Sequence, residues 1–368
     1  MPIPLINADF WSGKKVLLTG HTGFKGSWLA LWLSELGARV TGIGLKPDTE
    51  PNLFNQLQLE DRLQRHHIAD IRDFQTLTAI VEASQPEVVL HLAAQPLVRR
   101  SYTDPLGTWA TNVQGSLHLL EALKSLQQPC AVVMVTTDKV YANQEWDYGY
   151  RESDRLGGHD PYSASKAAAE LAIASWRSSF CGRGRHQTPY LAIATARAGN
   201  VIGGGDWAAD RIVPDAMRAL AAGETIEVRN PLATRPWQHV LEPLSGYLLL
   251  AEQLAATPGP ENRYANAFNF GPSLEANRTV QDLIEEIFQH WGGTWRDLSD
   301  PHAPHEAGRL HLQIDKAHHQ LGWRPVWSFN TTVERTVNWY KAVQDGGLAL
   351  TSCLDDMAAY QAFQTTPI

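Results

Sequence analysis

Short apolar runs alternate with longer amphipathic stretches over the first 200 residues of the chain. Runs that are apolar throughout and end in polar residues or glycine are typical of buried parallel strands. They predict strands at residues 15–19, 38–45, 87–93, 131–136 and 191–196. Apolar residues at helical spacing predict helices at 24–36, 74–83, 104–126 and 161–180. This order predicts an α/β fold, a doubly wound parallel sheet with helices on both faces.

The pattern changes after residue 200. A glycine-rich loop at 203–206 precedes a predicted helix at 210–222 and a short strand at 225–228, and two further helices are predicted at 242–256 and 280–291. We expect a first domain over residues 1–199 that also includes about 240–270. A smaller, partly interleaved C-terminal domain would comprise 200–239 and 271–345, and residues 346–368 form a tail of unassigned role.

Composition excludes some classes of protein without indicating an activity. Hydrophobic residues make up 43% of the chain, which is enough for a sizeable core. The net charge of −8 argues against a nucleic-acid polymer or an anionic membrane as partner. The three cysteines are far apart, and we find no signal-peptide pattern and no apolar run of about 18–20 residues. We therefore expect a cytoplasmic protein without a membrane partner.

A glycine-rich turn joins the first predicted strand to the first predicted helix. Gly20, Gly23 and Gly26 are spaced as G-x-x-G-x-x-G rather than the more familiar G-x-G-x-x-G. Glycines let the backbone turn tightly and approach a pyrophosphate, which then binds at the helix N-terminus. The position of the turn favours a dinucleotide site over an ordinary loop, so the first domain is predicted to be of Rossmann type.

Further segments bear on the identity of this dinucleotide. Asp70 and Ile71 follow a presumptive strand, where they could meet an adenine edge or form an ordinary turn. The small residues at 92–94 would let a cofactor lie close to the backbone. Lys46 stands near the end of the second strand, where NAD enzymes commonly carry an acidic residue for the ribose. Because of Lys46, these residues leave the choice between NAD and the less favoured NADP open.

Two groups of polar residues suggest chemistry. Tyr162 and Lys166 are four residues apart on a predicted helix and so share one face. A nearby ammonium and the nicotinamide charge would favour the phenolate, making the tyrosine a usable base. The segment 136–139 leaves a buried strand at the end that faces the ligand crevice of such folds, and it offers hydroxyl, carboxyl and amine groups. Either group alone could be an ordinary surface feature, and the combination favours a catalytic site.

With these motifs the chain resembles the extended short-chain dehydrogenases/reductases and, within them, the CDP-glucose 4,6-dehydratases of deoxysugar biosynthesis. The resemblance covers roughly residues 9–340. The segments that carry it are 20–26, 93–99, 137–139, 160–166, 197–207 and 235–247. The last two segments are long and specific, whereas 20–26 and 160–166 mark only the superfamily.

The resemblance implies a closed redox cycle on CDP-glucose. Tyr162, helped by Lys166, would take the proton of the 4-hydroxyl, to which Thr137 hydrogen-bonds, while C4 gives a hydride to NAD⁺. The new 4-ketone acidifies the C5 proton, a base removes it, and Asp138 protonates the departing 6-hydroxyl. The hydride then returns to C6, which gives CDP-4-keto-6-deoxyglucose without net oxidation.

Lys139 distinguishes the chain from the dTDP-glucose 4,6-dehydratases, which usually carry Asp-Glu after the threonine, with glutamate as the C5 base. The resembling CDP-glucose enzymes carry lysine at this position. A neutral Lys139 could be the base if burial lowers its pKa. Alternatively, a charged Lys139 could stabilise the enolate while another group moves the proton.

Positions that match the family give the expected binding residues. Those expected to contact the cofactor are Gly20, Thr22, Gly23, Phe24, Lys25, Gly26, Asp70, Ile71, Leu92, Ala93, Ala94, Thr136, Tyr162 and Lys166. Those expected to contact the sugar nucleotide are Gln95, Arg99, Asn200, Arg211, Arg235 and Trp237. Arg235 suits the diphosphate because a guanidinium binds phosphate oxygens bidentately. For Trp237, core packing explains the residue as well as ligand contact does.

Other functions and assemblies were weighed on the same residues. Another sugar-nucleotide 4,6-dehydratase stays possible, and a 4-epimerase shares the turn and the Tyr/Lys pair but needs no acid such as Asp138. A non-catalytic NAD(P)-sensing regulator would often lack that pair. His302, His305 and His311 have no tight ligand spacing, so we expect no metal. We expect a homodimer or homotetramer formed through the helices at 104–126 and 161–180.

Overall fold

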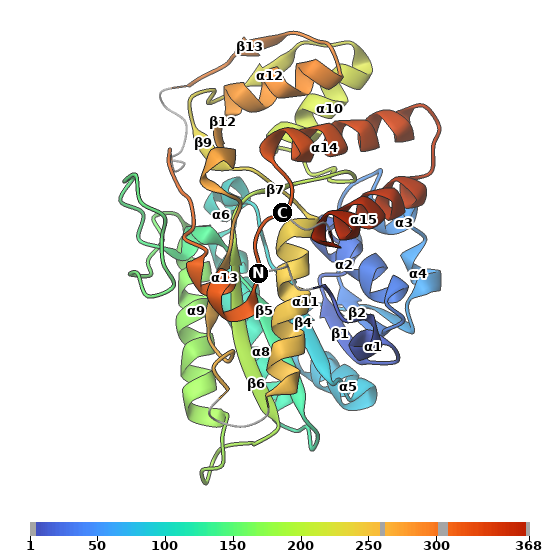
Figure 1. The fold of residues 1–368 in the computed structure, drawn as a ribbon. Helices are drawn as coiled ribbons and strands as arrows, with labels where there is room; N and C mark the ends of the chain where they lie inside the picture. The colour runs from blue at the N-terminus through green and yellow to red at the C-terminus, as the bar shows by residue number, and fades with distance from the viewer. Residues whose placement is uncertain (1–4, 258–261, 301–307, 366–368) are drawn as a thin grey trace.

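A seven-stranded parallel sheet lies at the centre of the computed structural model, which describes residues 5–257, 262–300 and 308–365 (Figure 1). Its strand order is β11-β6-β5-β4-β1-β2-β3. The strands are β1 (Lys15–Thr19), β2 (Arg39–Gly44), β3 (Arg65–Ile68), β4 (Val88–His91), β5 (Cys130–Val135), β6 (Leu191–Ala198) and β11 (Ala267–Phe270). The order reverses between β1 and β4, so a ligand crevice is expected at the carboxyl ends of these strands. The predicted doubly wound sheet is confirmed.

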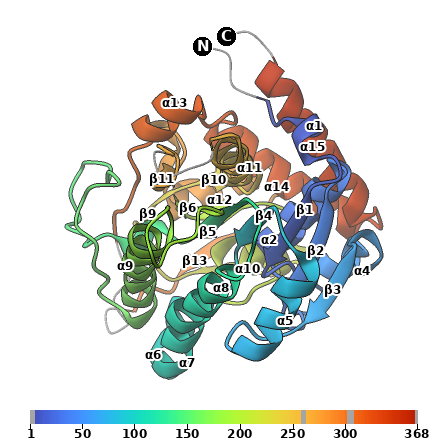
Figure 2. The ribbon, with the colours of Figure 1, turned by 90° about the horizontal axis from the view of Figure 1, so that it is seen from below.

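Helices cover both faces of the sheet (Figure 2). On one face lie α2 (Phe24–Glu35) and α11 (Leu241–Ala256), and on the other α5 (Phe74–Ser84), α8 (Ser116–Leu123) and α9 (Pro161–Phe180). Successive strand side chains point to opposite faces, so Val132 packs with the α5–α8–α9 side and Val133 with the α2–α11 side. Burial on both faces explains why the strands read as continuous apolar runs.

The single helix predicted at 104–126 is divided in the structure. It comprises α7 (Pro105–Trp109), a π-helical segment η1 (Ala110–Gly115) and α8, and α6 (Val98–Thr103) precedes it. Asp104 begins α7 because its carboxylate accepts the Gly107 N–H at 2.9 Å. The wide turn of η1 contains the buried Asn112, and such turns are frequent at functional sites.

A smaller layer lies beyond the carboxyl edge of the sheet, at the top of Figure 1. It contains α10 (Ile212–Ala222), β8 (Ile226–Val228), β9 (Thr234–Pro236), β12 (Asn277–Thr279), α12 (Val280–His290) and β13 (Trp295–Asp297). Strand β8 pairs with β13 and β9 pairs with β12. The chain leaves the main sheet after β6, returns through α11 and β11, and leaves it again.

The remaining elements fix the ends and connections of the fold. They are α1 (Ala8–Trp11), α3 (Leu53–Gln56), α4 (Leu59–Arg62), η2 (Asp138–Val140), β7 (Val201–Ile202), β10 (Gln238–His239), η3 (Leu274–Ala276), α13 (Asp315–Leu321), α14 (Phe329–Gln344) and α15 (Ala349–Thr365). The tail, to which the sequence pattern assigned nothing, forms α15. Its Tyr360 is fully buried and donates a 2.7 Å hydrogen bond to Glu242 Oε2 on α11. None of the helices within the described residues is both long and apolar enough to cross a membrane.

Candidate active site

The glycine turn after β1 is held by close backbone contacts. Gly20 has a φ of +76°, and a Cβ there would lie 2.7 Å from the Ala93 backbone nitrogen. A Cβ at Gly26 would collide with the carbonyl oxygen of Gly20. At Gly23, the residue before α2, a Cβ would meet no protein atom nearer than 3.5 Å. The turn therefore leaves open space at the N-terminus of α2, which fits a cofactor pyrophosphate.

Three side chains of the turn are placed by their own contacts. Thr22 Oγ1 donates to the Leu45 carbonyl at 2.8 Å, which ties the turn to the end of β2. Phe24 begins α2 beside Gly203 of the smaller layer. Lys25 Nζ donates to Tyr247 Oη at 3.3 Å. Burial and, to a lesser extent, the nearby Arg211 lower the pKa of Lys25 to about 7.

The cofactor residues predicted after β3 and β4 lie at the same edge of the sheet. The Asp70 carboxylate binds the Arg72 guanidinium at 2.6 Å, which lowers the pKa of Asp70. Ile71 is buried against η1. After β4, the N–H groups of Leu92 and Ala93 donate to Thr19 at 3.1 and 3.2 Å. Ala94 is half-buried and continues this segment, which packs against the glycine turn.

The segment after β5 brings an acid to the crevice. Asp138 is only 2% exposed, and its Oδ1 accepts the Thr137 hydroxyl at 3.0 Å. The close packing of this carboxylate requires a glycine at 199, where a Cβ would lie 2.9 Å from Asp138 Oδ2. Burial raises the pKa of Asp138, although Lys139, Thr137 and Arg235 oppose the shift. A raised pKa favours the protonated carboxyl group, which makes Asp138 a candidate general acid.

The predicted base lies on α9, beside that segment. Asp160 caps the helix by accepting the Ser163 N–H at 3.0 Å, which places Tyr162 and Lys166 in its first two turns, both buried. Burial raises the pKa of Tyr162 to about 12, while a hydrogen bond with Thr137 acts in the opposite direction. The phenol is therefore protonated at neutral pH in the protein alone. Formation of the Tyr162 phenolate therefore requires added positive charge, which a bound nicotinamide would supply.

A buried carboxylate behind these residues was not foreseen from the sequence. Glu170 accepts hydrogen bonds from Thr136 Oγ1 at 2.5 Å and Thr195 Oγ1 at 2.9 Å, and it pairs with Arg197 at 2.7 Å. The Thr136 hydroxyl thus points toward Glu170, and its predicted cofactor contact stays a prediction that would involve other atoms of the residue. In the sequence, only the spacing of four residues between Tyr162, Lys166 and Glu170 indicates that Glu170 shares a helix face with the other two.

Asn112 is a second residue that the sequence analysis missed. Its side-chain amide donates to Ser165 Oγ on α9 at 2.9 Å and to the Gln95 carbonyl at 3.1 Å, so η1 ties the base-bearing helix to the loop after β4. The Gln95 side chain is itself bonded to Thr108 and to the backbone of Leu97. Its predicted contact with substrate stays a prediction.

The arginines predicted to contact the sugar nucleotide have protein partners in the structure. Arg211 binds Asp206 at 2.8 Å, and Arg99 lies 3.5 Å from Asp210. Arg235 donates to the Thr234 carbonyl at 2.9 Å. Because its charge also lowers the pKa of Asp138, the guanidinium lies close enough to the candidate acid to act on it electrostatically.

The last two predicted substrate residues differ in exposure. Asn200 is half-buried after β6. Trp237 is buried, and its indole N–H donates to the Arg278 carbonyl at 3.0 Å. Because this bond satisfies the buried indole N–H within the protein, packing explains the burial of Trp237 without a ligand contact. Its contact with substrate stays a prediction.

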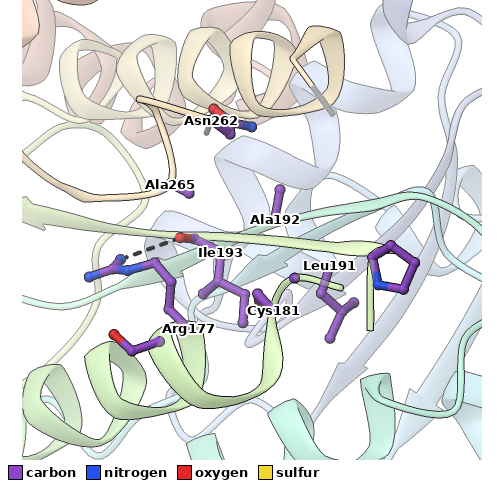
Figure 3. Close-up of a pocket in the computed structure, with 10 residues that line it drawn as sticks. Arg177, Cys181, Leu191, Ala192, Ile193, Asn262 and Ala265 are labelled. Carbon is purple, nitrogen blue, oxygen red and sulfur yellow. Dashed lines mark hydrogen bonds between the residues drawn. The ribbon is translucent and has the colours of Figure 1, made fainter. Parts of the chain in front are cut away.

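Within the described part of the chain, no group of three His, Cys, Asp or Glu side chains could hold a metal ion. His302 and His305 lie outside the described residues. A cavity of about 340 Å³ lies beside Leu191 at the amino end of β6 (Figure 3). There Arg177 donates to the Ile193 carbonyl at 3.3 Å. The crevice lies at the opposite, carboxyl end of the strands, so this cavity is not part of the candidate active site.

Comparisons with known proteins identify the family of the chain. The sequence pattern of the family described as GDP-mannose 4,6 dehydratase matches residues 17–336. A CDP-glucose 4,6-dehydratase of Salmonella typhimurium is 48% identical over 340 residues, covering 92% of this chain and 93% of the relative. A dTDP-glucose 4,6-dehydratase of Xanthomonas campestris is 26% identical, covering 88% and 92%.

Solved structures show the same fold. A dTDP-glucose 4,6-dehydratase from Streptomyces venezuelae, solved with NAD and TYD bound, is 25% identical with a TM-score of 0.74, covering 91% of this chain and 99% of that one. A UDP-glucose 4-epimerase from Thermotoga maritima is 21% identical with a TM-score of 0.72, covering 89% and 99%. The second likeness concerns the fold alone.

Proposed function

Since the chain belongs to the GDP-mannose 4,6 dehydratase family and, within it, to the CDP-glucose 4,6-dehydratases, we propose that five residues at the carboxyl edge of its sheet perform the dehydration. These residues are Thr137, Asp138, Lys139, Tyr162 and Lys166. The chain is an NAD-dependent hydro-lyase that acts on a sugar nucleotide. Its reaction converts CDP-glucose to CDP-4-keto-6-deoxyglucose.

The observation that carries the residue assignment is the position of Thr137 between the two candidate proton-transfer groups. Its hydroxyl donates to Asp138 Oδ1 at 3.0 Å and shares a hydrogen bond with Tyr162. A sugar whose 4-hydroxyl meets Tyr162 can therefore present its 6-hydroxyl to Asp138 within the same small crevice. A 4-epimerase requires only the first of these contacts, so a buried acid at this point favours the dehydratase.

Each side chain then has one task. When bound, NAD would accept the hydride from C4 and later return it to C6. Tyr162 takes the proton of the 4-hydroxyl, and Lys166 stabilises the resulting phenolate. Asp138 gives its proton to the departing 6-hydroxyl, so that water leaves while a base removes the C5 proton. The returning hydride at C6 and a proton at C5 complete the product.

Lys139 has two proposed roles that the half-buried position of the residue leaves open. It is either the C5 base or the cation that stabilises the enolate. Lys139→Met separates them when product formed in D₂O is analysed for deuterium at C5. If Lys139 is the base, elimination stops in the variant; if it stabilises the enolate, slow elimination continues with deuterium still entering at C5.

We propose that the remaining predicted residues bind the ligands. The domain formed by residues 1–199 and about 240–270 would hold NAD, and 200–239 with 271–345 would hold the nucleotide. Arg235 is placed best for the diphosphate, because it lies near the acid and the phosphates must lie close to C1 of the same sugar. Arg99, Arg211, Asn200 and Gln95 would complete that site.

We further propose a cytoplasmic homodimer or homotetramer that uses the segment α7–η1–α8 and α9 as an interface. Large apolar side chains are exposed on both elements, with Leu106 at 83% and Leu171 at 62%. α7 and η1 lie against α9, so these side chains belong to neighbouring elements. Exposed apolar surface of this kind is typical of interfaces between subunits. Sedimentation of wild type against Leu106→Glu and Leu171→Glu tests the assignment, and unchanged mass in both variants would contradict it.

Incubation with NAD⁺ and, separately, CDP-, dTDP-, UDP- and GDP-hexoses tests the activity. We expect a 4-keto-6-deoxy product from CDP-glucose. A 4-keto-6-deoxy product only from another nucleotide would move the chain to a different 4,6-dehydratase. Accumulation of a 4-epimer with no dehydrated product from any of the four would overturn the dehydratase assignment.

A further inference from the structure

Glu170 occupies a place on α9 that links it to both catalytic residues of that helix. It follows Lys166 by four residues and Tyr162 by eight, so all three lie along one helix face. The side chain is 3% exposed. Its carboxylate receives three hydrogen bonds, from Thr136, Thr195 and Arg197. The ion pair and these bonds keep the pKa of Glu170 below its ordinary value despite burial, so the group is an anion.

The partners of Glu170 reach the acid-bearing segment from both sides. Thr136 directly precedes Thr137, and its hydroxyl is bound to Glu170 Oε1 at 2.5 Å. Arg197 also donates to Tyr141 Oη at 2.9 Å, and Tyr141 directly follows η2. Residues 137–140 are thus held before and after by one buried network whose centre lies on the helix of Tyr162. A buried hydrogen-bonded network of this kind restricts the segment to one geometry.

The same carboxylate acts on Lys166. Burial lowers the pKa of Lys166 to about 8, and the charge of Glu170 opposes that shift. Two other groups face Lys166 from the neighbouring elements. Lys25 on α2 is a like charge, and His91 on β4 is neutral because burial lowers its pKa to about 3. Among these groups Glu170 is the one whose charge favours the ammonium.

Two further charges face Glu170 itself, Arg197 from β6 and Arg177 from α9. Both arginines are present in wild type and in Glu170→Gln, so a difference between the two proteins reports the loss of the Glu170 charge. Tyr162, on the same helix, is protonated in the protein alone, because burial raises its pKa to about 12.

We propose that Glu170 is a positioning residue for the dehydration. It fixes the acid-bearing segment 137–140 relative to Tyr162, and it keeps Lys166 charged. The inference rests on the catalytic roles proposed above for Asp138, Tyr162 and Lys166. Glu170 touches neither the sugar nor the cofactor in this account, and it acts only through these residues.

The test compares Glu170→Gln with Glu242→Gln. Glutamine keeps the shape and accepts hydrogen bonds but carries no charge. For Glu170→Gln we expect a fall in kcat of about 10- to 100-fold, because small misplacements of catalytic groups cost this much, with KM for CDP-glucose little changed. We also expect the alkaline limb of the kcat profile to move to lower pH by about one unit, since Lys166 releases its proton more easily without the anion.

Glu242→Gln is the matched control, because it changes another buried carboxyl group, whose hydrogen bonds come from Tyr360 on α15 and from the backbone of Val326 and Trp327. Its profile should follow wild type. A second measurement titrates the ammonium directly in ¹³C-lysine-labelled protein without cofactor, with Lys166→Met to assign the signal. The pKa of Lys166 should fall in Glu170→Gln and stay at about 8 in Glu242→Gln.

A softer variant keeps the inference testable if Glu170→Gln folds poorly. Thr195→Val removes one of the three donors and leaves the charge, so it should lower kcat without moving the pH limb. Wild-type kcat and pH profile in Glu170→Gln, or an equal shift in Glu242→Gln, would overturn the positioning role. If wild type instead fails to dehydrate CDP-glucose, the proposed function fails, and the lysine titration still decides the electrostatic part.

Discussion

Replacing Asp138 by asparagine separates the two halves of the proposed reaction. The amide has nearly the same shape as the carboxyl, and its oxygen can still accept the Thr137 hydroxyl that Asp138 Oδ1 receives at 3.0 Å. The fold should therefore be retained. What the variant lacks is a proton that can be given to the departing 6-hydroxyl. Oxidation at C4, which uses Tyr162, does not need that proton.

The size of the effect follows from the role of a general acid. Such a group contributes about 10²- to 10⁴-fold to a rate, which corresponds to about 3–5 kcal/mol of barrier. The upper part of this range applies because Asp138 is 2% exposed and bulk water has little access to replace it. In wild type the elimination should also slow as pH rises through the raised pKa of Asp138, since the acid then loses its proton. Asp138→Asn should lose this dependence.

Rapid mixing with CDP-glucose, followed by the near-ultraviolet absorbance of the reduced cofactor, measures both halves. Asp138→Asn should form the reduced cofactor at nearly the wild-type rate and then hold it, while the 4-keto-6-deoxy product appears far more slowly. Unchanged turnover would remove Asp138 from the acid role. Failure to form any reduced cofactor, with a normally folded variant, would show that Asp138 acts in the first half instead.

Three further predictions follow from the same geometry. Tyr162→Phe should form no reduced cofactor in that assay, whereas early accumulation would assign the base elsewhere. Gly26→Ala should lower both Tm and NAD affinity because its Cβ collides with the Gly20 carbonyl, while Gly23→Ala should weaken NAD binding at nearly unchanged Tm. Burial raises the pKa of Glu242 to about 7 from 4.5, so its stabilising contribution is complete below the lower value and is lost as pH rises through the higher. Thermal melts of Glu242→Gln should show a flatter fall in Tm over that interval.

Local signals explain which elements could be predicted. The strands at 15–19 and 131–136 are apolar on both faces because helices cover both, so a simple run in the sequence was sufficient. The helix at 161–180 carries its own start signals, an Asp160 cap and Pro161 at the first turn, and the structure reproduces its limits. Such features depend on neighbours in the sequence alone.

Other elements depend on distant partners. The helix expected over 104–126 contains the π turn η1, whose Asn112 is bonded to Ser165 more than 50 residues away. The tail was not assigned because α15 has apolar residues on several sides, and it gains its burial by packing on α14, α3, α11 and α2. The role of Glu170 was equally hidden, since Thr136, Thr195 and Arg197 reach it from two separate strands.

Burial favours the active form of the acid of this site and the inactive form of its base. It raises the pKa of both Asp138 and Tyr162. For an acid that must give a proton, the shift favours the protonated, active form. For a base that must take one, the same shift creates the inactive form, so Tyr162 becomes active only when positive charge surrounds it. Lys166 supplies part of that charge only while it remains an ammonium, which Glu170 favours. The first proton transfer therefore depends on the occupied crevice, whereas burial alone already favours the form of Asp138 that the second step needs.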